Sequence, residues 1–428
     1  MSIAKPPEIE LENGSRGRPL GVYVHFPWCL SKCPYCDFFS VATHSAIPHQ
    51  VYADAVISEF DRRFDAISPS FIKSLYFGGG TPSLWDVDAL GRVITHILGK
   101  FGVTSRAIEV TLECNPSSFS LARCFKWQEL GVNRLSLGLQ SLNDSDLQYL
   151  GRAHNAREGL ATLDAALASG MPRVCADLIF GLPGRSPGDA VAEIKRLPLD
   201  ALSHMSLYAL TIEQNTPFGA LARAGRLALA PDESVADSFV ALHKELAAVN
   251  FEHYEISNYA RRGERSVHNM GYWQGNDYLG LGVAAFGTVN ANTSQSFAPQ
   301  EGERIRYRNT TRIQQYLDLC SGEATELVWQ MHPAGLLTDF ELIDPGIGFT
   351  ERLMLGLRTS DGIDLDELSR QFDINPWLTK RRHSIDRLVR QGRLNQDGAR
   401  LRIPFKTWFL ADGTISELIW TQAKQAAS

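Results

Sequence analysis

The stretch HFPWCLSKCPYCDFFS, residues 25–40, places Cys29, Cys33 and Cys36 within eight positions. Three thiolates spaced C-x3-C-x2-C on a loop can hold a cubane iron–sulfur cluster. Four protein ligands would complete the coordination of such a cluster, as in electron-carrying ferredoxins. Three ligands leave one iron with an open coordination site, which a small chelating molecule can occupy. The stretch therefore predicts a 4Fe-4S cluster with one ligand-binding iron.

Zinc is the alternative metal for this loop. A structural zinc site needs four protein ligands in a tetrahedral arrangement, and His25 is the available fourth donor. His25 lies four residues before Cys29 on a predicted strand, so we expect its side chain to point elsewhere. Three buried thiols without metal are a further alternative, which the flanking prolines disfavour.

Outward from this stretch, short apolar runs alternate with amphipathic segments as far as residue 259. This alternation predicts parallel strands joined by helical crossovers. Six such units favour an α/β fold, a partial (βα)6 TIM-like barrel, and a doubly wound open sheet is the competing fold. The apolar runs are GVYVHF, SLYFGGG, AIEVTLEC, NRLSLGLQ, RVCADLIFGLP and LSHMSLYAL. The amphipathic segments are residues 51–67, 87–98, 158–169 and 234–249.

The alternation stops near residue 260, where we place a domain boundary. The predicted organisation is a flexible tail over residues 1–19, a barrel over 20–260 and a mixed, mainly helical C-terminal domain over 261–428. Within the last domain, the pattern first predicts loops and short strands up to residue 296. Helices are then predicted over residues 304–320 and 349–357, followed by a small helical unit that ends in a hairpin.

Composition narrows the possible partners and the compartment. A net charge of -6 on 428 residues, without a basic run, gives no electrostatic reason to expect nucleic acid. No window has the roughly 18 apolar residues of a membrane span, and the polar N-terminal segment lacks the apolar core of a signal peptide. We therefore expect a cytosolic protein. The remaining cysteines are predicted to be small apolar core residues: Cys114, Cys124, Cys175 and Cys320.

Polar residues gather at the predicted C-terminal ends of the strands, where barrels of this kind hold their active sites. FGGGTP, residues 77–82, directly follows the second strand, and its glycines let a backbone approach a ligand closely. Glu113, Gln140 and Asp177 lie in or at the end of three further strands, where burial is costly without a partner. Arg152 follows the fourth strand and could provide a cation for a carboxylate.

The three-cysteine motif, with an aromatic residue before the last cysteine, resembles the signature of radical S-adenosylmethionine (radical SAM) proteins. The resemblance extends through most of the chain. It implies that the open iron binds the amino and carboxylate groups of S-adenosylmethionine, which is then cleaved by an electron from the cluster.

Within that superfamily, the chain resembles the oxygen-independent coproporphyrinogen III oxidase family, and especially its haem chaperone branch, HemW. The matching stretches are YVHFPWCLSKCPYCDF, GGGTPS, LECNP, RLSLGLQSLNDSDLQYLGRAH and DLIFGLPGRS. The resemblance implies these cofactor-binding residues: Tyr23, Gly79, Gly80, Thr81, Glu113, Gln140, Arg152 and Asp177.

Two features indicate the chaperone branch rather than the oxidases. The oxidases of the family carry a further cysteine two residues after the third ligand, and this chain has Phe38 there. They also carry a longer segment ahead of the cluster, whereas Cys29 here follows only 28 residues.

The segment HNMGYW, which starts at His268, matches the H-N-x-x-Y-W motif associated with haem binding in the chaperone branch. It offers an imidazole for iron and two aromatic faces for a porphyrin. The alternative is a hydrogen-bonded histidine in a turn beside core aromatics. One nearby position departs from the family, because relatives often have a histidine where this chain has Phe286.

The resemblance implies a haem chaperone that binds haem and transfers it to an acceptor protein, with a membrane haemoprotein as one candidate acceptor. In that case the protein would work in the cytosol or at the membrane surface. An oxygen-independent coproporphyrinogen III oxidase is the alternative function. A radical SAM enzyme with another substrate is the third.

Overall fold

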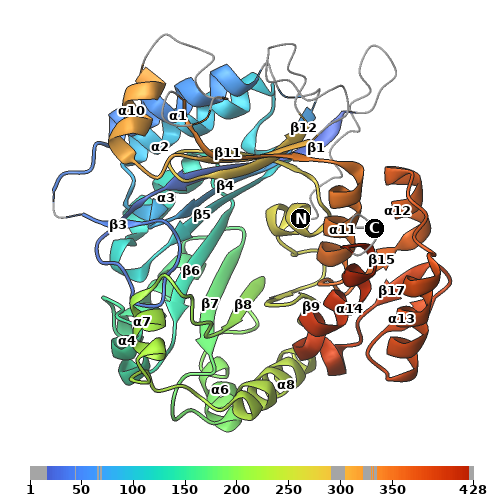
Figure 1. Ribbon diagram of the computed structural model, residues 1–428. Coiled ribbons are helices and arrows are strands. Elements are labelled where there is room, and N and C mark those ends of the chain that lie inside the picture. Colours follow the sequence, from blue (N-terminus) through green and yellow to red (C-terminus); the bar gives the residue numbers. More distant parts are fainter. Residues whose placement is uncertain are drawn as a thin grey trace.

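The computed structural model describes residues 17–423, apart from residues 44, 65–66, 68–69, 291–303, 322–328, 330 and 332–334. One large curved sheet dominates these residues, with helices along its outer side and a C-terminal group of helices beside its last strands (Figure 1). Most of the predicted tail, residues 1–16, lies outside the described part of the chain, and so do residues 291–296 of the predicted loops.

Six strands of the sheet run parallel and follow one another in chain order. A doubly wound sheet would reverse its strand order at a switch point, and no such reversal occurs between these six strands. The predicted partial (βα)6 barrel is therefore confirmed. Its strands are β1 (Arg18–Phe26), β4 (Ser70–Gly79), β5 (Glu109–Cys114), β6 (Arg134–Gln140), β7 (Val174–Phe180) and β8 (His204–Ala209).

The crossovers are helical, as the amphipathic segments predicted. Each helix turns its apolar side toward the sheet, as in α2, where Leu90, Val93 and Ile97 are fully buried. Polar caps set the helix starts. Asp86 accepts from the Ala89 N–H at the start of α2. The crossover helices include α1 (His49–Phe64), α2 (Val87–Lys100), α3 (Leu121–Glu129), α5 (Ala156–Ala168), α6 (Pro187–Ile194) and α8 (Asp232–Ala248).

The sheet continues past both ends of the parallel core. On the far side of β8 it adds β10 (Asn258–Ala260) and β9 (Glu252–Glu255), both antiparallel to their neighbours. On the free side of β1 it adds β11 (Asp277–Leu281), which is parallel to β1. Beyond β11 come the antiparallel strands β12 (Phe286–Asn290), β13 (Arg304–Asn309) and β14 (Leu337–Ile343). Strands from both sides of residue 260 thus share one sheet.

The helix predicted over residues 304–320 is wrong in its first part. Its opening residues, RIRYRN, form β13, in which Ile305 and Tyr307 are buried and the alternating arginines are less so. This is the two-residue period of a strand with one buried face. The helix α10 (Ile313–Ser321) begins after that strand.

A short helix, α9 (Val267–Trp273), lies against the starts of the parallel strands. The Glu109 carboxylate, on the first residue of β5, accepts from the backbone N–H groups of Val267 and His268 at 3.1 and 3.0 Å. Arg134 forms an ion pair with the same carboxylate at 2.8 Å, and both side chains are buried. Because breaking a buried ion pair is costly, Glu109 holds the start of α9 in place.

The C-terminal residues form a mainly helical group, as predicted. It contains α11 (Pro345–Gly356), α12 (Leu365–Phe372), α13 (Thr379–Arg390) and α14 (Ala411–Ala423). A three-stranded sheet accompanies them, made of β15 (Ile363–Asp364), β16 (Asn395–Asp397) and β17 (Arg400–Arg402). None of the helices in the described ranges combines the length and the apolar character that crossing a bilayer requires.

Candidate functional site

A cavity of about 390 Å³ lies where the parallel strands end. Gly79 is the last residue of β4 and Gln140 the last of β6, so the cavity occupies the rim that the sequence predicted. Ten of the predicted site residues line it together: Cys29, Cys33, Cys36, Gly79, Gly80, Thr81, Glu113, Gln140, Arg152 and Asp177. Tyr23 and His268 do not.

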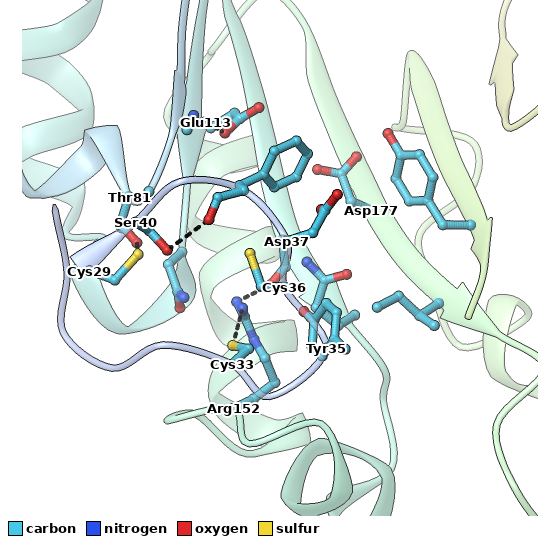
Figure 2. A pocket seen from close by; sticks show the side chains of 18 of the residues that line it. Cys29, Cys33, Tyr35, Cys36, Asp37, Ser40, Thr81, Glu113, Arg152 and Asp177 are labelled. Atoms are coloured by element: carbon cyan, nitrogen blue, oxygen red, sulfur yellow. Dashed lines mark hydrogen bonds between the residues drawn. The ribbon is translucent and has the colours of Figure 1, made fainter. Parts of the chain in front are cut away.

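The three cysteines come from the end of β2 (Trp28–Cys29) and the loop after it (Figure 2). Thr81 Oγ1 lies 3.5 Å from Cys29 Sγ, and Arg152 Nη1 lies 3.5 Å from Cys33 Sγ. Burial raises the pKa of Cys29, and it raises the pKa of Cys36 to about 11. These are neutral thiols that would lose protons on binding a metal.

The thiols fit an iron–sulfur cluster better than a single zinc ion. Within the described ranges, no three His, Cys, Asp or Glu side chains are grouped to hold one metal ion. His25 is not a fourth ligand in this structure, because its Nε2 lies 2.8 Å from the Phe39 carbonyl and its Nδ1 3.0 Å from the Tyr23 hydroxyl. In a cubane cluster the thiolates bind separate irons, so they need not converge on one point.

Two carboxylates, those of Glu113 and Asp177, face the same cavity (Figure 2). Glu113 accepts from the Tyr76 hydroxyl at 2.7 Å and from the Gly79 N–H at 3.3 Å. Burial raises the pKa of Glu113 to about 7; these two hydrogen bonds oppose the rise, and the nearby charge of Asp177 adds to it. Neither carboxylate forms an ion pair with another described residue. A cationic ligand would relieve both charges.

Asp177 is held by neighbouring side chains of β6 and β7. Ser136 Oγ donates to Asp177 Oδ2 at 2.7 Å, and Cys175 Sγ lies 3.1 Å from Oδ1. Burial raises the pKa of Asp177, although these hydrogen bonds favour its ionised form. The carboxylate therefore has a fixed orientation before any ligand arrives.

The glycine segment packs closely against the strand that leads into the cysteine loop. The N–H of Gly80 donates to the Phe26 carbonyl at 2.7 Å, and the N–H of Thr81 donates to the Trp28 carbonyl at 2.9 Å. A Cβ on Gly80 would lie 2.7 Å from the Trp28 carbonyl oxygen, which only a glycine avoids. The N–H groups are thus used within the protein, and the segment positions the cysteine loop.

Gln140 and Arg152 complete the polar lining. Gln140 has a φ of 65°, a left-handed conformation that is strained for a residue with a side chain. Arg152 Nη2 donates to the Gly138 carbonyl at 2.9 Å, while its buried Nε has no partner among the described residues. An anionic group of a ligand could bind this guanidinium beside the cysteines.

Tyr23 and His268 lie deeper in the barrel, toward the starts of the strands. The ring of His268 stacks on Tyr76 with centroids 4.7 Å apart, and Tyr23 lies next to both rings. His268 is 4% exposed, and its Nδ1 and Nε2 lie 2.9 Å from Ser74 Oγ and 3.0 Å from the Tyr272 hydroxyl. With Ser74 and Tyr272 it lines a separate cavity of about 280 Å³.

Sequence reasoning missed the residues that hold the two carboxylates. Tyr76 supports Glu113 from the neighbouring strand β4, and Ser136 supports Asp177 from β6. Ser136 lies four residues before Gln140 on the same strand, so the two-residue period could have placed both on the cavity side.

Comparisons with known proteins agree with this geometry. Residues 23–197 match the Radical SAM superfamily, and residues 349–410 match the HemN C-terminal domain. The chain is 36% identical over 304 residues to the Heme chaperone HemW of Haemophilus influenzae, covering 70% of this chain and 76% of that protein. It is 29% identical to the Mycobacterium tuberculosis Heme chaperone HemW, over 94% of this chain and 95% of that protein.

A solved structure shares the fold across nearly the whole chain. Coproporphyrinogen III oxidase (HemN) from Escherichia coli, described as a radical SAM enzyme, superimposes with a TM-score of 0.75 at 19% identity, covering 94% of this chain and 90% of that one. An open barrel of six parallel strands with three thiols at its rim defines a radical SAM protein. The identities over most of both chains show further that this chain belongs to the HemW family.

Proposed function

We propose that this protein is a haem chaperone with a 4Fe-4S cluster on Cys29, Cys33 and Cys36 and S-adenosylmethionine on the remaining iron. It would bind haem and pass it to an acceptor protein, in the cytosol or at a membrane surface. The observation that carries the cofactor assignment is one cavity in which the three loop thiols face two half-buried carboxylates that form no ion pair with another described residue. The names of the HemW relatives support the haem assignment.

Each part of the cavity has a role in holding that cofactor. Glu113 and Asp177 would meet its cationic groups, and Arg152 would meet its carboxylate. Tyr76 and Ser136 hold the two protein carboxylates in place. When bound, the cluster supplies one-electron chemistry to the cofactor.

The affinity for S-adenosylmethionine is expected to depend on pH through Glu113. With a pKa of about 7, this carboxyl group is mostly protonated at pH 6 and mostly ionised at pH 8 in the empty cavity. A cationic cofactor binds the ionised form, so the affinity should rise about tenfold from pH 6 to pH 8. Equilibrium dialysis with the anaerobically reconstituted protein measures this change.

Glu113→Gln is the matched variant for this experiment. It keeps the size of the side chain, cannot ionise, and should bind the cofactor more weakly and with little pH dependence in this range. An equally steep profile in Glu113→Gln would assign the titration to another group. A flat profile in the wild type would contradict the role of Glu113.

The oxidase remains the second candidate function because the HemN structure has the same fold. Phe38 favours the chaperone. It lines the cavity beside the cysteines and is 64% exposed, at the position where the oxidases carry a cysteine. Titration of the reconstituted protein with haem, followed in the Soret region, tests the chaperone function.

If His268 ligates haem, one of its two hydrogen bonds must first break. Tyr272→Phe keeps the aromatic ring but frees Nε2, so it should strengthen haem binding by about fivefold, the value of one ordinary hydrogen bond. His268→Ala should weaken haem binding. Soret titrations of both variants measure these changes.

Iron content and melting temperature serve as controls for both variants. The cluster binds at the opposite end of the strands, so iron content should not change. Weaker haem binding in Tyr272→Phe, with an unchanged melting temperature, would contradict ligation by His268. It would indicate that the Tyr272 hydroxyl itself contributes to haem binding.

A further inference from the structure

A chain of buried hydrogen bonds connects the cofactor cavity with the helix α9 that carries His268. It starts at the Ser266 N–H, which lies 3.3 Å from the Tyr254 hydroxyl. It continues from Tyr254 to His204 Nε2 at 2.7 Å and from His204 Nδ1 to Cys175 Sγ at 2.9 Å. It ends at Asp177 Oδ1, 3.1 Å from Cys175 Sγ.

The ends of this chain fix its direction. A backbone N–H can only donate, and an ionised carboxylate can only accept. The Tyr254 hydroxyl therefore accepts from Ser266 and donates to His204 Nε2. His204 then carries its proton on Nδ1 and donates to Cys175, which leaves the Cys175 S–H for Asp177.

Burial keeps Cys175, His204 and Tyr254 in the protonation states that this direction requires, and the hydrogen bonds to Asp177 favour its ionised form. Cys175 is 2% exposed, His204 3% and Tyr254 0%. Burial raises the pKa of the Cys175 thiol and of the Tyr254 hydroxyl well above their usual values, so both keep their protons. It lowers the pKa of His204 well below its usual value, so the imidazole is neutral.

Three strands and the start of α9 contribute to this series of hydrogen bonds. Cys175 on β7 and His204 on β8 are direct partners in the parallel register. Tyr254 comes from β9, and Ser266 caps the N-terminus of α9. Cys175 is buried, as predicted, and it also belongs to a hydrogen-bonded polar network that the sequence did not indicate. The other three cysteines outside the loop are buried, as predicted.

We propose that Cys175, His204 and Tyr254 are positioning residues that orient Asp177 for the cofactor. Through the same hydrogen bonds, they couple cofactor binding in the cavity to the position of helix α9. This inference rests on the proposed function, since it takes S-adenosylmethionine as the ligand of Asp177. A ligand that draws Asp177 toward itself changes the acceptor at the end of the chain. That change alters the hydrogen bond between the Ser266 N–H and the Tyr254 hydroxyl, which holds the start of α9 together with the bonds to Glu109.

A spectroscopic test needs neither cofactor nor cluster. The S–H stretching band of Cys175, identified by its loss in Cys175→Ala, reports the hydrogen bond to Asp177. In Asp177→Asn the acceptor is neutral and weaker, so the band should move to higher frequency. An unmoved band would show that Cys175 does not donate a hydrogen bond to Asp177, and this result would contradict the proposal whatever ligand the protein binds.

A double-mutant cycle tests the positioning role. Cys175→Ala should weaken S-adenosylmethionine binding by about fivefold, and Cys175→Ser, which keeps a donor, should restore most of it. If Cys175 acts only through Asp177, adding Cys175→Ala to Asp177→Asn should cost nothing further. Equal losses in both backgrounds would overturn the positioning role.

Cys124→Ala is the matched control because Cys124 is a fully buried cysteine that bonds to Ser169, 3.3 Å away, and lies outside the cavity lining. It should leave cofactor affinity unchanged. A loss equal to that in Cys175→Ala would mean that any buried cysteine change loosens the cavity, and would overturn the proposal. Absence of cofactor binding in the wild type would instead overturn the proposed function, and the S–H band would still test the chain.

The coupling to α9 is tested with haem as the second ligand. Saturating S-adenosylmethionine should change the haem affinity of the wild type by about fivefold or more, as expected for two coupled sites. Tyr254→Phe breaks the chain near α9 and should bring this ratio close to one. A wild-type ratio of one, or an unchanged ratio in Tyr254→Phe, would overturn the coupling.

Discussion

Replacing Cys29, Cys33 or Cys36 by alanine is expected to abolish the cluster. The wild-type protein, purified without oxygen, should be brown and contain about four irons per chain. Each thiol lines the rim cavity, and a cluster held by two protein thiolates would lose an anchor. Cys114 also lines the cavity, but burial raises the pKa of its thiol to about 12, which disfavours the thiolate that binds iron. Iron analysis and the visible absorption spectrum measure the loss.

Cys124→Ala tests whether the loss is specific to the loop. Cys124 lies in α3, is fully buried, and takes no part in the cavity. Its replacement should leave the iron content and the spectrum intact. Bleaching as complete as in the loop variants would show that the ligand assignment is wrong.

The second large expected effect is that the protein binds haem but has no oxidase activity. The wild-type protein, given cluster, cofactor and reductant, should bind haem with a Soret shift and yet make no protoporphyrin-type product from coproporphyrinogen. The physical reason is Phe38, an apolar side chain at the cavity that can neither bind a metal nor provide a thiol. Anaerobic incubation followed by porphyrin fluorescence measures the product.

The oxidase of Escherichia coli, assayed under the same conditions, is the positive control. Its turnover shows that the reductant and substrate are competent. Robust turnover by the present protein, combined with no haem affinity, would reverse the assignment and make this chain an oxidase.

Local patterns were enough to predict the barrel and most of its rim. Each of the six apolar runs became a strand of the parallel core, because a strand buried on both faces needs a continuous apolar run. The ends of parallel strands meet at one edge, so Glu113, Gln140 and Asp177 could be grouped without knowing any contact. The three cysteines of the loop could be predicted to lie together from their spacing alone.

Features that depend on distant pairing could not be predicted. The sequence predicts a helix where β13 lies, because the alternating pattern of β13 runs directly into the helical pattern of α10. The left-handed φ of Gln140 could not be predicted, because glycine is the usual sequence signal of that conformation and position 140 is a glutamine. The conformation depends on how β6 is held in the fold. The network of Cys175 required the register between β7 and β8, which no local pattern specifies.

The position of β1 in the sheet has a consequence for biosynthesis. β1 is hydrogen-bonded to β4 on one side and to β11 on the other, with Leu20 opposite Asp277. On the ribosome, the first strand emerges long before the partner that completes its second ladder. The cysteine loop directly follows that strand, so it stays next to an open sheet edge for most of translation. We therefore expect metal loading to follow the emergence of β11, when this contact of long sequence separation can close.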